Sequence, residues 1–231
     1  MLKIENLNQF YGESHTLWDL SLEVPEGSCT CLMGRNGVGK TTLLRCIMGL
    51  EKTSSGRIIF DGQDIAGLDA ERRAPLGIGF VPQGREIFPQ LTVEENLKIG
   101  LLARQDGLKE IPERIFHLFP VLKEMLQRRG GDLSGGQQQQ LAIGRALAVD
   151  PKLLILDEPT EGIQPNIVRQ IGDIIVQLNQ EEKLTVLLVE QKLAFARRTG
   201  QQFHLMEKGR VVASGPMSGL SDELVHRHLA V

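Results

Sequence analysis

Apolar residues recur along the first third of the chain in short runs that glycine, glutamate and proline separate. Runs of this length and spacing predict strands over residues 2–7, 15–24, 28–33, 56–62 and 77–83. Asp61-Gly62 predicts a turn, and Pro82 ends the last of these strands. One helix, over 40–49, is expected to interrupt the series.

The middle of the chain changes to helical spacing. From Val93 to about Arg129 the pattern predicts helix with breaks at Gly107 and Pro120, and a further helix is expected over 135–149. Wholly apolar strands follow at 152–158 and 184–190, with a helix over 165–182 between them and a short helix after them.

Continuous apolar strands that alternate with helices are typical of a parallel sheet covered on both faces. We therefore expect an α/β core. Neither an internal repeat nor a linker is visible, which predicts a single domain over residues 1–231 with a helical insertion at about 84–149.

The composition is that of an ordinary globular protein of 231 residues. A net charge of -3, with no basic run longer than two residues, gives no field that would attract nucleic acid. No apolar stretch approaches the ~18 residues of a membrane-spanning helix, and the first ten residues lack the apolar core of a signal peptide. We expect a cytoplasmic protein without a nucleic-acid partner.

Cys29, Cys31 and Cys46 are expected to be small core residues, because the paired spacings of a zinc site are missing. The histidines show one short spacing, His226 and His228, which we assign to a solvated final helix.

The strongest chemical signal is "GRNGVGKTT", which fits G-x-x-x-x-G-K-[ST] and lies between a predicted strand and a predicted helix. Such a loop points successive N–H groups at phosphate oxygens, and the helix start adds its positive dipole end. Lys40 would reach the β- and γ-phosphates and Thr41 would offer its hydroxyl to Mg²⁺. The nucleotide-binding residues expected here are Gly34, Arg35, Asn36, Gly37, Val38, Gly39, Lys40, Thr41 and Thr42.

A second signal is "KLLILDEPT", a buried strand that ends in two carboxylates. Open α/β sheets bind ligands at the carboxyl ends of their strands. Asp157 is expected to serve Mg²⁺, and Glu158 to be the general base that activates water for attack on a γ-phosphate. Alone, an acidic strand end is most often solvated, and it is the phosphate loop that favours the catalytic reading.

A third signal is "LSGGQQQQLAIG". Ser134 and Gln137 fit a capping box, which accounts for both residues as an ordinary helix start. It does not account for Gly135 and Gly136, which each cost the first turn roughly 1 kcal/mol relative to alanine. Unhindered N–H groups at a helix start predict a second anion site, formed by Ser134, Gly135, Gly136 and Gln137.

Together these motifs, with Gln83 in "FVPQ", resemble the ATP-binding-cassette ATPases, in the family's order and across essentially the whole chain. The resemblance implies a P-loop NTPase core with a mostly parallel sheet, an N-terminal antiparallel β subdomain and an inserted helical subdomain. It also implies a head-to-tail dimer in which the "LSGGQ" of one subunit faces the phosphate loop of the other across ATP.

The resemblance assigns two further residues. It implies that Tyr11, in "QFYG", stacks on adenine, whereas the residue alone would read as a half-exposed strand aromatic. It also implies that Gln83 ends a loop that touches Mg²⁺ and relays contact with a membrane subunit.

Two positions depart from the wider family. Gln191 stands where many members have a histidine, and glutamine can hydrogen-bond but cannot carry a proton's charge. We therefore expect Gln191 only to orient the γ-phosphate or water, with Glu158 as the sole base. Gln164 stands where an aspartate is common, and its effect on communication between sites is open.

The segments "GREIFPQLTVEENL", "DEPTEGIQP" and "LLVEQ" resemble the second ATPase subunit of branched-chain amino acid importers, most closely that of urea and short-chain amide importers. This implies separate membrane permeases, a periplasmic solute-binding protein and a second ATPase subunit, either a sister chain or another copy. The chain would sit on the inner face of the cell membrane. The first segment is expected to dock a permease loop, or to pack Phe88 and Leu91 into the core.

There are three alternatives to the importer function. A lipopolysaccharide-export ATPase would keep the histidine at position 191. A non-transport ATP switch would need a long coiled coil between the phosphate loop and "LSGGQ", or two cassettes in one chain, and this sequence shows neither. A module that only binds nucleotide is disfavoured by the intact Lys40, Asp157 and Glu158.

Overall fold

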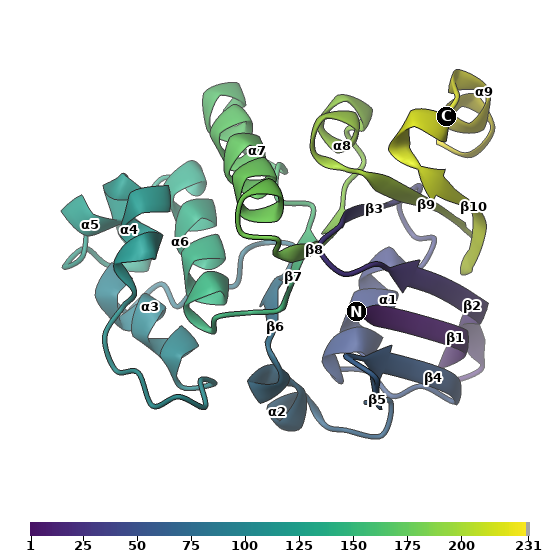
Figure 1. Cartoon of the computed structure of the whole chain (residues 1–231), viewed down its shortest axis with the longest axis horizontal. Coiled ribbons are helices and arrows are strands. Elements are labelled where there is room, and N and C mark those ends of the chain that lie inside the picture. Colours follow the sequence, from purple (N-terminus) through teal and green to yellow (C-terminus); the bar gives the residue numbers. More distant parts are fainter. Residues whose placement is uncertain (230–231) are drawn as a thin grey trace.

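The computed structural model describes residues 1–229, and in them the longer of two sheets carries the parallel strands (Figure 1). Its order is β10-β9-β3-β8-β7-β6. All neighbours pair in parallel except β10, which runs antiparallel to β9 at one edge. The strands are β3 (Cys29–Met33), β6 (Ile78–Val81), β7 (Leu153–Asp157), β8 (Thr185–Val189), β9 (Gln202–Glu207) and β10 (Arg210–Pro216).

The shorter sheet is antiparallel, in the order β2-β1-β4-β5. Its strands are β1 (Leu2–Tyr11), β2 (Ser14–Val24), β4 (Ser55–Phe60) and β5 (Gln63–Asp64). The predicted turn at Asp61-Gly62 is confirmed, with both residues at positive φ between β4 and β5. The mixed, mostly parallel sheet and the separate antiparallel sheet confirm the expected fold class.

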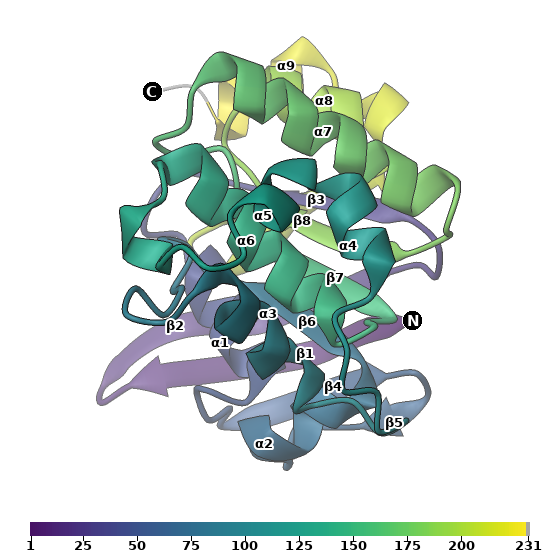
Figure 2. The ribbon, with the colours of Figure 1, turned by 90° about the vertical axis from the view of Figure 1, so that its left-hand side faces the viewer.

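The central strands bury both faces, so alternate residues enter two different cores. Leu32, Ile155 and Leu187 point to one side, where helix α1 (Lys40–Met48) and the antiparallel sheet pack against them. Cys31 and Leu188 point to the other side, into a core shared with helices that follow β6. Figure 2 shows the antiparallel sheet and those helices on opposite sides of the parallel strands.

Helices α7 (Pro165–Gln180) and α8 (Leu193–Thr199) cover the second face of the parallel sheet. Between β6 and β7 the chain forms a helical lobe, at the left of Figure 1, built from α3 (Val93–Leu101), α4 (Glu113–Leu118), α5 (Pro120–Glu124) and α6 (Gly135–Ala148). The remaining helices are α2 (Ala70–Arg73) and α9 (Asp222–His228), with short 3₁₀ turns at 74–76, 130–132 and 217–219.

The helical run predicted from Val93 to Arg129 is confirmed at its Gly107 break, which lies between α3 and α4, but it is wrong over residues 102–105, 111–112 and 125–129, which lie outside the helices. Arg104 leaves the helix because its guanidinium reaches Ala148 O, 3.3 Å away at the end of α6, and pairs with Asp106. A cation at a helix C-terminus satisfies free carbonyl groups there. The break at Pro120 is confirmed, since α5 begins at that residue.

The three cysteines are buried and unpaired, as predicted. The final helix exists as α9, but a solvated His228 is wrong, because Nδ1 lies 2.8 Å from Glu207 Oε2 and the side chain is 13% exposed. The apolar pattern did not predict β9 and β10, the second of which alternates exposed and half-buried positions around Gly215 and Pro216. No helix within residues 1–229 is both long and apolar enough to cross a membrane.

Close contact between α3 and α6 depends on Gly100. A Cβ at this position would collide with the Arg145 carbonyl oxygen and lie 2.9 Å from Ala148 Cβ. We expect Gly100→Ala to force the helices apart and lower the free energy of unfolding by about 1–3 kcal/mol, the usual cost of overpacking. Urea denaturation measures this loss of stability. The control is Gly67→Ala, at an exposed glycine with no atom within 4 Å of an added Cβ. Equal stability of the two variants would contradict the packing argument.

Candidate functional site

The phosphate loop connects the end of β3 to the start of α1 at the carboxyl edge of the parallel sheet. Gly37 and Gly39 adopt φ angles of 78° and 106°, which other residues adopt only with strain. Gly39 is the N-cap of α1 and supplies no side-chain acceptor, so the first amides of this nine-residue helix are free to bind an anion.

Lys40 is the first residue of α1 and is only 5% exposed. Its ammonium donates to Gly34 O at 2.8 Å and to Arg35 O at 2.9 Å. Burial lowers the pKa of Lys40, while the carboxylates of Glu158 and Asp157 oppose the shift. The loop thus folds back around a cation that retains donor capacity for a phosphate oxygen.

Asp157 is the last residue of β7 and is 2% exposed. One oxygen, Oδ2, accepts a hydrogen bond from Thr41 Oγ1 at 3.2 Å, and the other, Oδ1, has no partner among residues 1–229. Burial raises the pKa of Asp157 to about 6, with the Thr41 hydrogen bond opposing it and the Glu158 charge adding to it. A cation would supply what this carboxylate lacks.

Glu158, directly after Asp157, has a left-handed backbone with φ 48°. Such a conformation costs a residue with a Cβ about 1 kcal/mol, and here it turns the side chain out of the strand. The Glu158 carboxylate accepts a hydrogen bond from Gln191 Nε2, which also lies 2.6 Å from Asn36 Oδ1. Residues from the ends of β7 and β8 and from the phosphate loop therefore meet at one point.

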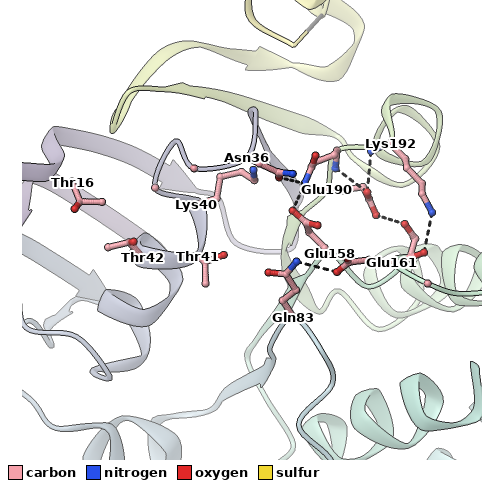
Figure 3. A pocket seen from close by; sticks show the side chains of 15 residues that line it. Thr16, Asn36, Lys40, Thr41, Thr42, Gln83, Glu158, Glu161, Glu190 and Lys192 are labelled. Carbon is pink, nitrogen blue, oxygen red and sulfur yellow. Dashed lines mark hydrogen bonds between the residues drawn. The ribbon is translucent and has the colours of Figure 1, made fainter. Parts of the chain in front are cut away.

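A cleft of about 640 Å³ lies here, and of the residues described above Asp157 is not part of its lining but contacts the lining residue Thr41 (Figure 3). Its lining residues are Thr16, Asn36, Gly37, Gly39, Lys40, Thr41, Thr42, Gln83, Glu158, Thr160, Glu161, Gly162, Glu190, Gln191 and Lys192. Gln83 reaches the cleft from the end of β6 and donates to Glu161 Oε2 at 2.9 Å.

Some predicted nucleotide-binding residues lie off the lining. Gly34 and Arg35 contribute carbonyl groups to Lys40, and Val38 packs against the core beneath the loop. Tyr11 stands 44% exposed at the end of β1 and does not line the cleft, so its stacking role stays a prediction.

The "LSGGQ" residues lie elsewhere. The predicted capping box is present: Gln137 N donates to Ser134 Oγ at 3.4 Å, and Ser134 N donates to Gln137 Oε1 at 2.9 Å. Ser134, Gly135, Gly136 and Gln137 line a second cleft, of about 470 Å³, together with Gln164 and Ile167. Within one chain, then, these residues do not meet the phosphate loop.

Sequence reasoning missed several residues at this edge, among them Arg85, Glu161 and Glu190. Glu161 and Glu190 follow the same two strands as Glu158 and Gln191, which is the signal that could have found them. No sequence signal marks Arg85, because only the folded structure brings it next to Gln138 and Glu161. Its guanidinium donates to Gln138 Oε1 at 3.2 Å and to Glu161 O at 3.4 Å, beside the start of α6.

The residues at this edge suit Mg²⁺. No cluster of three His, Cys, Asp or Glu side chains within residues 1–229 forms a metal cage. Mg²⁺ bound with a nucleotide requires few protein ligands, because phosphates and water complete its shell. The unpartnered Oδ1 of Asp157 beside the Thr41 hydroxyl fits that requirement.

Comparison with known proteins gives the same picture. The profile of the ABC transporter family matches residues 17–161. The chain is 42% identical to the high-affinity branched-chain amino acid transport ATP-binding protein BraG of Pseudomonas aeruginosa, over 92% of this chain and 91% of the relative. It is 39% identical to a probable branched-chain amino acid transport ATP-binding protein, LivF, of Archaeoglobus fulgidus, over 95% and 94%.

Among solved structures, a dimeric ATP-binding cassette in a post-hydrolysis state with ADP and phosphate superposes with a TM-score of 0.85 at 29% identity. The match covers 95% of this chain and 100% of that one. A nucleotide-free cassette from an ABC transporter gives 0.83 at 28% identity, over 100% of this chain and 95% of that one.

The raised pKa of Asp157 has a consequence for stability. The folded state keeps this proton up to about pH 6, whereas the unfolded chain loses it near pH 4, so unfolding becomes easier as pH rises between those values. We expect the free energy of unfolding of Asp157→Asn to exceed that of the wild type by up to about 3 kcal/mol at pH 7.5, without nucleotide or metal. At pH 4 this difference should disappear.

Denaturant titrations of both proteins at the two pH values measure this difference, and other titrating groups cancel in the comparison. A difference that is the same at pH 4 and pH 7.5 would show that the Asp157 pKa is not raised.

Proposed function

The chain belongs to the ABC transporter ATPases, and on that basis we propose that it powers an importer of branched-chain amino acids or of urea and short amides. It is an ATPase and the ATP-binding subunit of an ABC importer. The observation that carries the proposal is a cleft lined by the phosphate loop and the strained Glu158, with the buried Asp157 hydrogen-bonded to the lining residue Thr41.

In this proposal residues 34–42 hold the triphosphate. The free amides of the first turn of α1 bind phosphate oxygens, and Lys40 exchanges its loop carbonyls for the β- and γ-phosphates. Tyr11 stacks on the adenine. Thr41, Gln83 and Asp157 hold Mg²⁺, which supplies charge neutralisation of the phosphates when bound. Support for Gln83 comes from its place in the cleft lining.

Hydrolysis then needs a base and an oriented water. Glu158 accepts the proton of a water molecule that attacks the γ-phosphorus, and the bond to the ADP oxygen breaks, which yields ADP and phosphate. Gln191 holds Glu158 and the water in line through its amide, and the hydrogen bond between the two side chains supports this role. Glutamine has no titrating group, so Glu158 is the sole base.

Two chains are required for a complete site. We propose that Ser134 to Gln137 of one subunit close over the ATP of its partner, because these residues line a cleft apart from the phosphate loop of their own chain. ATP bound on both sides would stabilise the dimer, and hydrolysis would release it. The partner is a sister ATPase or a second copy.

Residues 1–231 act as one nucleotide-binding domain, with residues 84–149 as its helical subdomain. Phe88, 44% exposed with the Arg145 guanidinium 5.3 Å from its ring, supports a permease dock in that subdomain rather than a core contact. Leu91 is half-buried. The chain works on the inner face of the cell membrane with permease subunits and a periplasmic solute-binding protein.

The base assignment is tested by Glu158→Gln. We expect steady-state ATP hydrolysis to fall at least ~100-fold, since a general base contributes about 10²–10⁴ to the rate. The variant should still bind ATP and, unable to hydrolyse it, should elute as a dimer in ATP and as a monomer without it.

Glu181→Gln, the same chemical change on an exposed residue at the end of α7, is the matched control and should hydrolyse ATP like the wild type. Near-normal hydrolysis by Glu158→Gln would refute the assignment, and a variant that stays monomeric in ATP would count against the composite site.

The solute is tested in cells. Deleting the gene should abolish high-affinity uptake of either labelled leucine or labelled urea, and a plasmid copy should restore it while a Glu158→Gln copy should not. Unchanged uptake of both solutes would remove the support for this importer, whatever the ATPase assay shows.

A further inference from the structure

Glu190 is a buried acid that the proposed mechanism does not use. It follows β8 directly and is 2% exposed. Its Oε1 accepts the N–H groups of Gln191 at 2.8 Å and Lys192 at 2.9 Å, and its Oε2 accepts the Thr160 hydroxyl at 2.7 Å. Burying a carboxylate is costly unless its oxygens are hydrogen-bonded, and here three donors converge on it.

These bonds join two loops of the site. Thr160 lies two residues after Glu158, in the loop that follows β7. Lys192 completes the connection, because its Nζ donates to Thr160 O at 2.9 Å. These contacts close a ring from Glu190 through Thr160 to Lys192, and Figure 3 shows Glu190 and Lys192 in the cleft with Glu158.

The Gln191 side chain is exposed, so packing does not fix where its amide lies. Its position in the site depends on the backbone that carries it. That backbone is held by the hydrogen bonds that Glu190 accepts from residues 191 and 192.

We propose that Glu190 is a positioning residue, which holds Gln191 against Glu158 and ties the loops after β7 and β8 together through Thr160. The proposal rests on the function proposed above, and Glu190 itself touches no reacting atom. A carboxylate suits this role because both oxygens accept, so one group serves donors from two loops, whereas glutamine offers a single acceptor oxygen.

A double-mutant cycle tests the connection to Gln191. We expect Glu190→Ala and Gln191→Ala each to lower kcat on the order of 10-fold with little change in the KM for ATP. The first substitution displaces the Gln191 amide and the second removes it. The double variant should be no more than ~2-fold slower than Gln191→Ala alone. Losses that multiply to ~100-fold would overturn the proposal.

Two variants separate positioning from general destabilisation. Asn179→Ala removes a side chain of equal burial that makes three hydrogen bonds at the opposite end of the sheet, so it should lower the melting temperature without lowering kcat. Glu190→Gln keeps one acceptor oxygen and should restore part of the kcat that Glu190→Ala loses. A kcat that simply follows the melting temperature across all variants would overturn the proposal.

Amide exchange supplies a readout that needs no activity. In nucleotide-free protein, the Gln191 and Lys192 amides should exchange at least ~10-fold faster in Glu190→Ala than in Asn179→Ala. Unchanged exchange would overturn the positioning role even if Glu158→Gln is inactive as expected. If Glu190→Ala speeds the exchange of these amides but the wild type has no ATPase activity, only the proposed function is refuted.

Discussion

The parallel register of β3, β8 and β7 is the constraint on which the rest of the site depends. Leu32 of β3 lies beside Val189 of β8, which in turn lies beside Asp157 of β7. Because the three strands end at the same level, the phosphate loop, Glu158 and Glu190 leave the sheet at one edge. No long-range loop has to bring them together, and the helix start of α1 adds its free amides at the same place.

Several groups at that edge have a folding cost. Asp157 has a buried oxygen without a partner among residues 1–229, Glu158 adopts a left-handed backbone, and Lys40 is buried beside carbonyl groups. Each feature weakens the folded state, and each prepares a group for a phosphate, a metal ion or a water molecule. The two apolar cores on either side of the parallel sheet give the stability that permits this arrangement.

The loop after β7 connects the two clefts. Gly162 lines both the phosphate-loop cleft and the cleft at the start of α6. Thr160, two residues earlier, is held by Glu190 and Lys192 from the loop after β8. A displacement of Gln191 would therefore move Thr160 and, with it, Gly162. Gly162 lies at the surface that we propose contacts the partner subunit.

Local sequence patterns predicted many of the helices and strands, though not β9 and β10, and most of the chemistry. Continuous apolar strands, glycines at a strand–helix junction and carboxylates at a strand end each act over a few residues, so "GRNGVGKTT", Asp157 and Glu158 were predictable. Tertiary structure decided what depends on neighbours remote in the chain. Arg104 lies after the end of α3, and its guanidinium donates to the carbonyl end of α6. Glu161 and Glu190 follow predicted strands, but their hydrogen-bond partners Gln83 and Thr160 were set by the pairing of β6, β7 and β8. Local patterns encode which structures a segment can form, whereas the hydrogen-bond partners of a buried charge exist only after strand pairing has placed them.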